Sequence, residues 1–191
     1  APSALGEDVS ADPPFPPGAR ADAARRGVIV HRLLERLPEV PPERRAEAGA
    51  RWLARNAADM AEGDRAELLA SALGVIGDPA WADLFAPGGL AEVPIAATVG
   101  GRVIAGTIDR LVITAQRIRL VDFKTARRPP EDLSQVPVAI LRQMAAYVAA
   151  LEAAYPGRAV EAALLYTAAP RLLALQRDLI EAHKPALTGE Q

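Results

Sequence analysis

The segment GTIDRLVITAQRIRLVDFKT, residues 106–125, decides the fold of this chain. It lies within two runs rich in Val and Ile, 102–114 and 117–124, which are typical of β-strands. Only residues 115–116 separate the two runs, and this spacing predicts an antiparallel hairpin that turns there. Because the Ala-Gln pair at 115–116 is not a preferred tight turn, the hairpin register is an assumption at this stage.

Each strand of this hairpin contains an aspartate, which strands normally exclude because a buried charge is costly to desolvate. With the turn at 115–116, Asp109 lies directly opposite Asp122, and both carboxylates share one face of the sheet. Lys124 follows Asp122 by two residues, so its ammonium group is predicted on the same face. A register shift of one residue would separate the two acids.

Two carboxylates a few ångström apart repel each other unless a proton or a cation lies between them. Oxygen ligands with open coordination positions suit Mg²⁺ or Mn²⁺, and a lysine beside such a metal can orient water or stabilise charge on a phosphate oxygen. The hairpin therefore predicts a metal-dependent site for phosphodiester hydrolysis. The alternative is structural: Asp109 would pair with Arg110 or Arg102, and Asp122 with Lys124.

Helices are predicted before the hairpin, and strands with one long helix after it. The expected helices are 21–37, 42–60, 64–73, 78–85, 137–155 and a weak one from residue 178, and the expected strands are 91–98, 102–114, 117–124, 160–167 and 171–175. Pro38 is expected to end the first helix, and Gly74 and Gly77 the third. This order favours an α/β fold with a mixed β-sheet flanked by helices and an N-terminal helical segment.

The chain is expected to contain one folded domain. Residues 1–19 are rich in Pro, Asp and small residues without hydrophobic periodicity, which is typical of a linker. Residues 20–191 are long enough for a single core in a chain of 191 residues and 20.2 kDa. Because the sequence opens on a linker without an initiator Met, we expect this domain to be the C-terminal part of a larger protein.

Composition excludes several classes of protein. The chain has no cysteine, so it cannot hold an iron–sulfur cluster, a thiol nucleophile or a zinc knuckle. Neither Lys124 nor Lys184 follows a glycine, so no phosphate loop and no ATP site is expected. The longest apolar runs fall well short of the roughly 20 residues of a membrane span, which predicts a cytoplasmic protein.

The net charge of −2 conceals an uneven distribution. Residues 100–130 hold seven basic and two acidic side chains, whereas residues 61–99 hold one basic and six acidic ones. A local field can hold phosphates even on a slightly acidic domain, so the 100–130 segment is expected to grip a nucleic-acid backbone without reading bases.

Five short motifs follow one another along the chain. They are GVIVH at 27–31, Glu92, GTIDRL at 106–111, VDFKT at 121–125, and Gln143 with Tyr147 in QMAAY. In this order they resemble the RecB-type branch of the PD-(D/E)xK nucleases. The HRLLERLP opening and the LYTAAPRL close resemble, more narrowly, the C-terminal nuclease domain of AddA, the helicase-nuclease subunit of bacterial AddAB. The resemblance covers residues 20–176 and implies a restriction-endonuclease-like core.

The resemblance also implies a metal site. His31, Asp109 and Asp122 would bind the catalytic Mg²⁺, which Mn²⁺ can replace, together with the main-chain carbonyl of Phe123. Lys124 would serve the nucleophilic water. The D-x-K form of the motif is intact at residues 122–124, which favours an active enzyme.

Further residues would support catalysis or hold DNA. Glu92 would be a supporting acid of the site. Gln143 and Tyr147 are spaced i, i+4 on one helix face and would position the DNA strand. Arg127 and Arg128 follow the catalytic strand and are either solvated or placed for phosphates of the substrate.

Four of these residues have ordinary alternatives. His31 could pair with Glu35 on the surface of its helix. Glu92 could be a solvated acid at the end of a strand. Tyr147 fits the apolar stripe of its helix, and it could belong to the core together with Gln143.

The resemblance implies a Mg²⁺-dependent deoxyribonuclease in recombinational double-strand break repair, located at the bacterial nucleoid. Its substrate would be single-stranded DNA, unwound by the helicase portion of the same parent chain and digested exonucleolytically. An AddB-type subunit would be its protein partner. Two alternatives remain open: a catalytically silent DNA-binding or assembly module of the same fold, and a freestanding RecB-like exonuclease.

Overall fold

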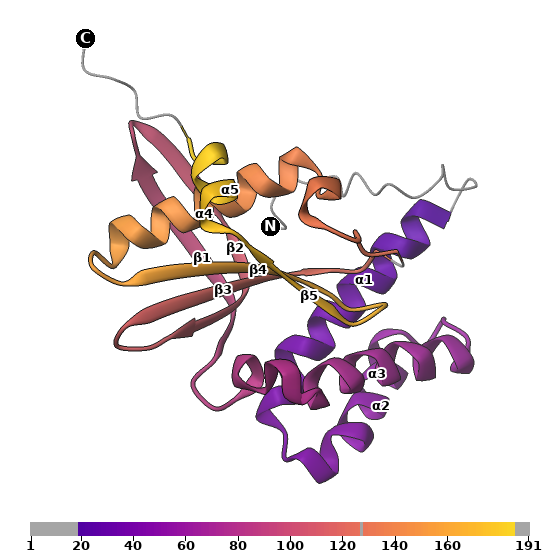
Figure 1. Ribbon diagram of the computed structural model, residues 1–191. Coiled ribbons are helices and arrows are strands. Elements are labelled where there is room, and N and C mark those ends of the chain that lie inside the picture. Colours follow the sequence, from indigo (N-terminus) through magenta and orange to yellow (C-terminus); the bar gives the residue numbers. More distant parts are fainter. Residues whose placement is uncertain (1–18, 127, 186–191) are drawn as a thin grey trace.

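A five-stranded sheet lies between two groups of helices in the computed structural model, which describes residues 19–126 and 128–185 (Figure 1). The α-helices are α1 (Ala19–Arg36), α2 (Arg45–Asn56), α3 (Glu62–Gly77), α4 (Val138–Ala154) and α5 (Arg177–His183). The 3-10 helices are η1 (Leu37–Glu39), η2 (Pro42–Arg44), η3 (Pro79–Phe85) and η4 (Leu133–Gln135). The strands are β1 (Leu90–Val99), β2 (Arg102–Ile113), β3 (Arg117–Lys124), β4 (Ala159–Tyr166) and β5 (Arg171–Leu175).

The sheet is mixed, with the strand order β1-β2-β3-β4-β5. Neighbouring strands are antiparallel except β3 and β4, which are parallel because α4 carries the chain back between them. The predicted α/β fold is confirmed: a mixed sheet flanked by helices with an N-terminal helical segment, consistent with a restriction-endonuclease-like core.

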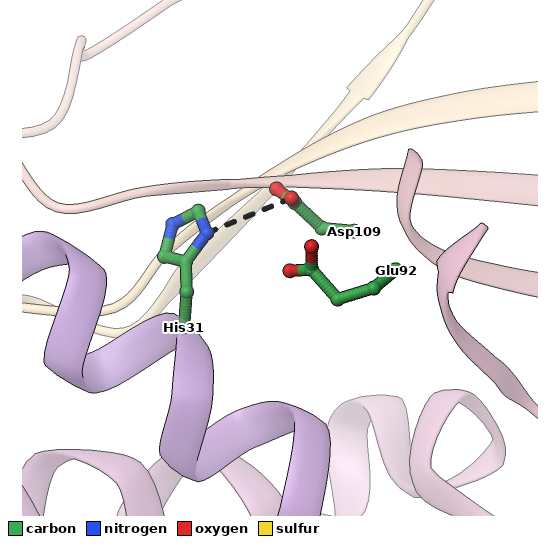
Figure 2. A group of neighbouring side chains, drawn as sticks. All are labelled: His31, Glu92 and Asp109. Carbon is green, nitrogen blue, oxygen red and sulfur yellow. Dashed lines mark ion pairs between the residues drawn. The ribbon is translucent and has the colours of Figure 1, made fainter. Parts of the chain in front are cut away.

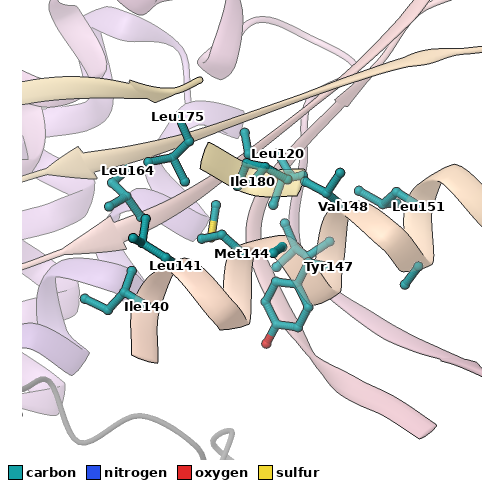
Figure 3. Close-up of a cluster of buried hydrophobic side chains, with 14 of the residues drawn as sticks. Leu120, Ile140, Leu141, Met144, Tyr147, Val148, Leu151, Leu164, Leu175 and Ile180 are labelled. Carbon is teal, nitrogen blue, oxygen red and sulfur yellow. The ribbon is translucent and has the colours of Figure 1, made fainter. Parts of the chain in front are cut away.

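Each face of the sheet buries its own apolar core. Helices α4 and α5 cover one face, where Met144 packs on Leu120 and Leu164 (Figure 3). Helices α1 and α3, with η3, cover the other face against Val121 and Phe123 of β3. Because side chains alternate along a strand, Asp122 belongs to the face that α4 covers.

The predicted register of the β2–β3 hairpin is confirmed for residues 110–113 against 118–121, whereas the predicted pair of Asp109 and Asp122 is not part of the ladder. Arg110 lies opposite Val121, and the same register holds along the whole ladder, so the turn falls at residues 115–116. Thr114 closes this turn. Its N–H and its hydroxyl both donate to the carbonyl of Arg117 over 2.9 Å, and its hydroxyl also accepts from the Arg117 N–H. A threonine side chain thus stabilises a turn that Ala-Gln alone would not favour.

Helix α3 extends beyond its predicted end. It continues through Gly74 as far as Gly77, because Val75 and Ile76 are both buried in the core beneath it. Burying an aliphatic side chain contributes about 1.5–3 kcal/mol, which exceeds the cost of about 1 kcal/mol for a helical glycine.

Local hydrogen bonds mark two other helix ends. The second predicted helix is divided into η2 and α2, and it ends at Asn56, whose side-chain amide donates to the Trp52 carbonyl over 2.8 Å. Asp78 caps η3 as predicted, because its carboxylate accepts the Ala80 N–H at 2.8 Å.

Within the described part of the chain, no single helix is both long and apolar enough to cross a membrane. The bent pair of α3 and η3 has a sufficient length and composition only when its two helices are taken together.

Candidate active site

Two of the acidic residues, Glu92 and Asp109, lie at a break in the ladder between β1 and β2. Val93 pairs with Ile108, and Ala91 pairs with Arg110, but Glu92 and Asp109 between them leave the ladder. Glu92 has a φ of 51°, a conformation that costs a non-glycine residue free energy and is most often found at functional sites.

Apolar residues before and after this break face the same core. Ile108 and Leu111 of β2 both pack beneath α4, although their odd spacing would send them to opposite faces of a regular strand. The strand therefore turns over at Asp109. At this point the side chain of Asp109 bonds to the main chain of β3, because its Oδ2 accepts the Phe123 N–H at 2.6 Å.

Three potential metal ligands meet at this break (Figure 2). One ligand atom each from His31, Glu92 and Asp109 lies within 4.8 Å of the others. His31 Nδ1 is 3.6 Å from Asp109 Oδ1. The His31 ring is held edge-on against Phe123, with 5.6 Å between ring centroids. We call His31, Glu92 and Asp109 the acidic trio.

The electrostatics of the acidic trio favour a cation. Burial lowers the pKa of His31, but its close approach to Asp109 and the negative charges of Asp109, Asp122 and Glu92 outweigh burial, so the net pKa is raised. Burial and repulsion from Asp109 raise the pKa of Glu92. A bound cation would relieve this repulsion, and neutral imidazole and carboxylate groups are ordinary metal ligands.

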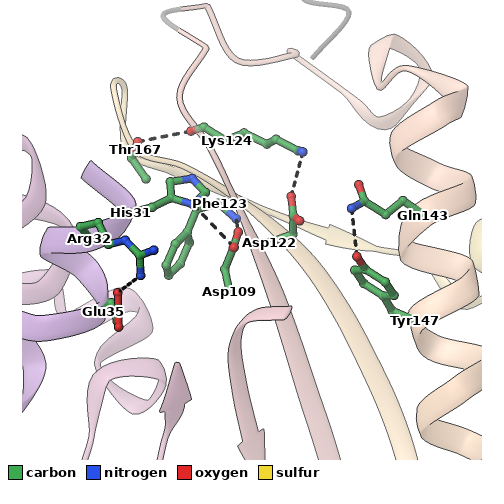
Figure 4. A network of polar contacts seen from close by, with 10 residues as sticks. All are labelled: His31, Arg32, Glu35, Asp109, Asp122, Phe123, Lys124, Gln143, Tyr147 and Thr167. Atoms are coloured by element: carbon green, nitrogen blue, oxygen red, sulfur yellow. Dashed lines mark hydrogen bonds and ion pairs between the residues drawn. The ribbon is translucent and has the colours of Figure 1, made fainter. Parts of the chain in front are cut away.

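Asp122 and Lys124 form a second group next to the acidic trio (Figure 4). Asp122 is 7% exposed, and the Nζ of Lys124 lies 2.9 Å from its Oδ2. Burial raises the pKa of Asp122, the Lys124 ammonium lowers it, and Asp109 raises it further. The ammonium group is the ion-pair partner of Asp122 Oδ2, an oxygen that is fully buried in the described structure.

The donor set of this site fits a hard divalent cation. The buried carboxylate of Asp122 is paired with the Lys124 ammonium, but the carboxylates of Glu92 and Asp109 lie nearby, and a cation would relieve this excess of negative charge. The acidic trio and Asp122 together offer three carboxylates and one imidazole, a set that suits Mg²⁺ or Mn²⁺. The structure brings the predicted ligands His31 and Asp109 together with Glu92, while Asp122 lies outside this 4.8 Å group and next to Lys124.

Of the ordinary pairings considered for these residues, the described structure contains one and lacks the others. Glu35 accepts a hydrogen bond from Arg32 at 2.7 Å, while His31 turns toward Asp109. Asp109 has no ion pair with an arginine in the part of the chain that the structure describes. Asp122 does pair with Lys124, as the structural alternative proposed.

The main chain of Lys124 is fixed by residues that sequence reasoning missed. The N–H of Thr167 donates to the Lys124 carbonyl at 2.8 Å, and its hydroxyl does so at 3.3 Å. The Thr167 carbonyl in turn accepts from Ser71 of α3 at 2.7 Å. Because β4 runs parallel to β3, the residue after β4 must meet the end of β3, and this topology is the signal that could have found Thr167.

Gln143 and Tyr147 lie on α4, on the other side of Asp122 from His31 in the view of Figure 4. The Gln143 amide donates to the Tyr147 hydroxyl over 3.2 Å. Tyr147 is only 3% exposed, and a Cβ placed on Gly106 would lie 2.1 Å from its hydroxyl oxygen. The ring is therefore part of the core, over the glycine that opens the GTIDRL motif, and only Gln143 is partly accessible.

Gly106→Ala should destabilise the fold by about 1–3 kcal/mol, because the new methyl group overlaps the buried Tyr147 side chain. The midpoint of urea unfolding measures this loss. The control is Gly74→Ala in α3, where a Cβ meets nothing within 4 Å and the helix should gain about 0.5–1 kcal/mol. Equal midpoints for the two variants would contradict the contact.

The basic residues of segment 100–130 do not gather on one face. Arg110 is buried, and Arg119 is turned away to pair with Asp83 at 2.7 Å. These two residues therefore do not form one freely exposed basic face, and the grip of this segment on a nucleic-acid backbone stays a prediction. Arg128 is exposed, and Arg127 lies outside the described residues.

Metal-ligating side chains and a lysine at a break in a mixed α/β sheet are typical of enzymes that hydrolyse phosphodiesters with a divalent metal. The family model described as the PD-(D/E)XK nuclease superfamily matches residues 6–186. The chain belongs to this superfamily, whose members are generally metal-dependent nucleases.

Other comparisons give weaker similarity. No curated protein matches the sequence. Among solved structures, the one titled "Crystal structure of SSO0001" is 16% identical, with a TM-score of 0.33, and the match covers 81% of this chain and 71% of that chain.

Proposed function

We propose that this chain is a Mg²⁺-dependent deoxyribonuclease that hydrolyses phosphodiester bonds. The observation that carries the proposal is the meeting of three carboxylates, one imidazole and one ammonium group, in which the buried Asp122 pairs with Lys124 next to the acidic trio. The membership of the chain in a superfamily of metal-dependent nucleases supports the same reaction class. Mn²⁺ has the same preference for oxygen ligands and is expected to replace Mg²⁺.

The roles follow from the positions of the side chains. The acidic trio and Asp122 would hold the metal, which supplies Lewis-acid activation of the scissile phosphate and of a water. Lys124 holds an ammonium group beside Asp122, where it can align the water and stabilise negative charge that develops on phosphate oxygens. Thr167 keeps the Lys124 main chain in place. The main-chain carbonyl of Phe123 is a further candidate ligand.

The finer proposal concerns the substrate and its delivery. We infer that the strand is single-stranded DNA, digested exonucleolytically and supplied by a helicase in the manner of RecB and AddA, with an AddB-type subunit as partner. The motif order from GVIVH to QMAAY supports this placement, as does the partly accessible Gln143 near Asp122. The role would be recombinational repair of double-strand breaks.

DNA degradation tests the activity. Labelled single-stranded and duplex DNA are incubated with the purified chain and Mg²⁺, Mn²⁺ or EDTA, next to Asp122→Ala. We expect metal-dependent cutting that the variant lacks, and faster cutting of single strands than of duplex. Faster cutting of duplex would contradict delivery by a helicase while leaving the nuclease intact.

A catalytically silent module of the same fold predicts a different outcome. A working site binds the metal in the folded state only, so Mn²⁺ should raise the melting temperature by an amount that grows with its concentration. Asp122→Ala should lose this gain. A melting temperature that ignores Mn²⁺ and Mg²⁺ in the parent chain, together with an absence of cutting, would favour the silent module.

A further inference from the structure

A buried arginine lies directly behind the acidic trio. Arg110 follows Asp109 in β2 and is 3% exposed. Its Nε donates to the Leu84 carbonyl at 2.6 Å, and its guanidinium carbon lies 5.3 Å from the centre of the Phe85 ring. These two contacts with η3 fix the orientation of the guanidinium plane.

The two terminal amino groups of Arg110 have no matching partner. Among residues 19–126 and 128–185, Arg110 forms no ion pair within 4.0 Å, and its terminal nitrogens donate no hydrogen bond. Neither nitrogen is among the fully buried atoms that lack a partner, so both keep contact with solvent. A buried guanidinium without a carboxylate is expensive, and an anionic ligand would compensate for it.

The guanidinium lines a groove that continues from the acidic trio. The groove runs between the end of α1 and the start of β1, and its walls include Arg36, Glu39, Gly89, Glu92 and Arg110. Glu92 belongs to both the groove and the acidic trio. Gly89 lies directly against the guanidinium, because a Cβ at this position would be 2.9 Å from one of its terminal nitrogens.

Three acids also line this groove, and only one of them faces Arg110 without compensation. Glu35 is neutralised by Arg32 at 2.7 Å, and Glu92 is grouped with His31 and Asp109 in the acidic trio. Glu39 remains. Burial lowers the pKa of Arg110, and Glu39 is the acid whose charge opposes this effect. Glu39 is exposed and is therefore able to turn away from an incoming anion.

We propose that this groove binds a backbone phosphate of the nucleic-acid strand next to the scissile one, with the guanidinium of Arg110 as its anchor. The inference rests on the proposed nuclease function for the class of ligand. An arginine held in one orientation offers two parallel donors, which is the geometry that phosphate oxygens accept. The subsite would hold the strand without reading its bases, because a phosphate carries no sequence information.

Binding of a fluorescent single-stranded oligothymidylate, measured by anisotropy in EDTA over a series of NaCl concentrations, tests this proposal. Arg110→Gln should bind about tenfold more weakly, which corresponds to the loss of one hydrogen-bonded charge pair. The slope of log affinity against log salt should fall by about 0.7, the contribution of one phosphate of a single strand. Arg110→Lys should restore part of the slope.

Two further variants keep the test decisive. Glu39→Gln leaves the contacts of Arg110 with Leu84 and Phe85 intact and should tighten binding, even if Arg110→Gln fails to fold. Arg51→Gln, on the exposed surface of α2, should change neither affinity nor slope. An unchanged slope in a folded Arg110→Gln, or unchanged affinity in Glu39→Gln, would overturn the subsite. Because EDTA prevents cleavage, binding that depends on Arg110 stands even if the chain cuts nothing, whereas cleavage with unchanged slopes removes the subsite and keeps the nuclease.

Discussion

Asp109→Asn should lower the rate of metal-dependent DNA cleavage by about a thousandfold or more, because a metal ligand contributes several kcal/mol to the stabilisation of the transition state. Asp109 is central to the site. Its Oδ1 faces His31 at 3.6 Å, and its Oδ2 accepts the Phe123 N–H at 2.6 Å. The asparagine keeps an oxygen for the Phe123 N–H while removing the charge, so the variant should fold normally.

Asp109→Ala separates the two roles of this carboxylate. It should lose cleavage to the same extent, and its free energy of unfolding should fall by about 1–3 kcal/mol because the buried Phe123 N–H is left unpaired. Rates of label release and urea unfolding midpoints measure the two effects. The gain in melting temperature with Mn²⁺ should be absent from both variants. Retention of that gain in Asp109→Asn would show that the metal lies elsewhere.

The hairpin at the centre of the fold could be predicted because its apolar alternation and the two residues between its strands agree on one register. The pairing of Arg110 with Val121 follows directly from a turn at residues 115–116. The position of Lys124 beside Asp122 follows from the same period of two. A strand sequence thus fixes which side chains share a face wherever the strand is regular.

The irregular part of the site could not be predicted in this way. Glu92 and Asp109 leave the ladder where β2 turns over, and regular alternation contains no such reversal. A signal was present, because Ile108 and Leu111 lie three positions apart, whereas neighbouring side chains on one face of a regular strand lie two positions apart. The positive φ of Glu92 depends on tertiary contacts and has no local signature in a non-glycine residue.

Charge along the sequence was a poor guide to charge on the surface. The surplus of basic residues in 100–130 suggested one binding face, but strand alternation and pairing send Arg119 toward Asp83 and Arg110 into the core. The spacing of Gln143 and Tyr147 correctly predicted that they share one face of their helix. Their exposure differs, because the tyrosine packs over Gly106 and the glutamine is partly accessible.

Lys124→Ala should also lower cleavage by about a thousandfold, but it should keep metal binding. The ammonium group is not a metal ligand, and it lies 2.9 Å from Asp122 Oδ2. Mn²⁺ should therefore still raise the melting temperature of this variant at neutral pH. The control is Lys184→Ala, which removes the only other lysine, paired with Glu152 at 2.6 Å on the α4–α5 contact, and should leave the cleavage rate unchanged.

The pH dependence of metal binding distinguishes this role from a purely structural one. Burial raises the pKa of Asp122, and the Lys124 ammonium opposes the rise. Without the lysine, the pKa of Asp122 rises further, so the carboxylate takes up its proton sooner as the pH falls. A proton on Asp122 competes with the metal, and the stabilisation by Mn²⁺ should disappear at a higher pH in Lys124→Ala than in the parent chain. If both proteins lose it at the same pH, Lys124 does not act on Asp122, and its assignment beside the nucleophilic water loses its physical basis.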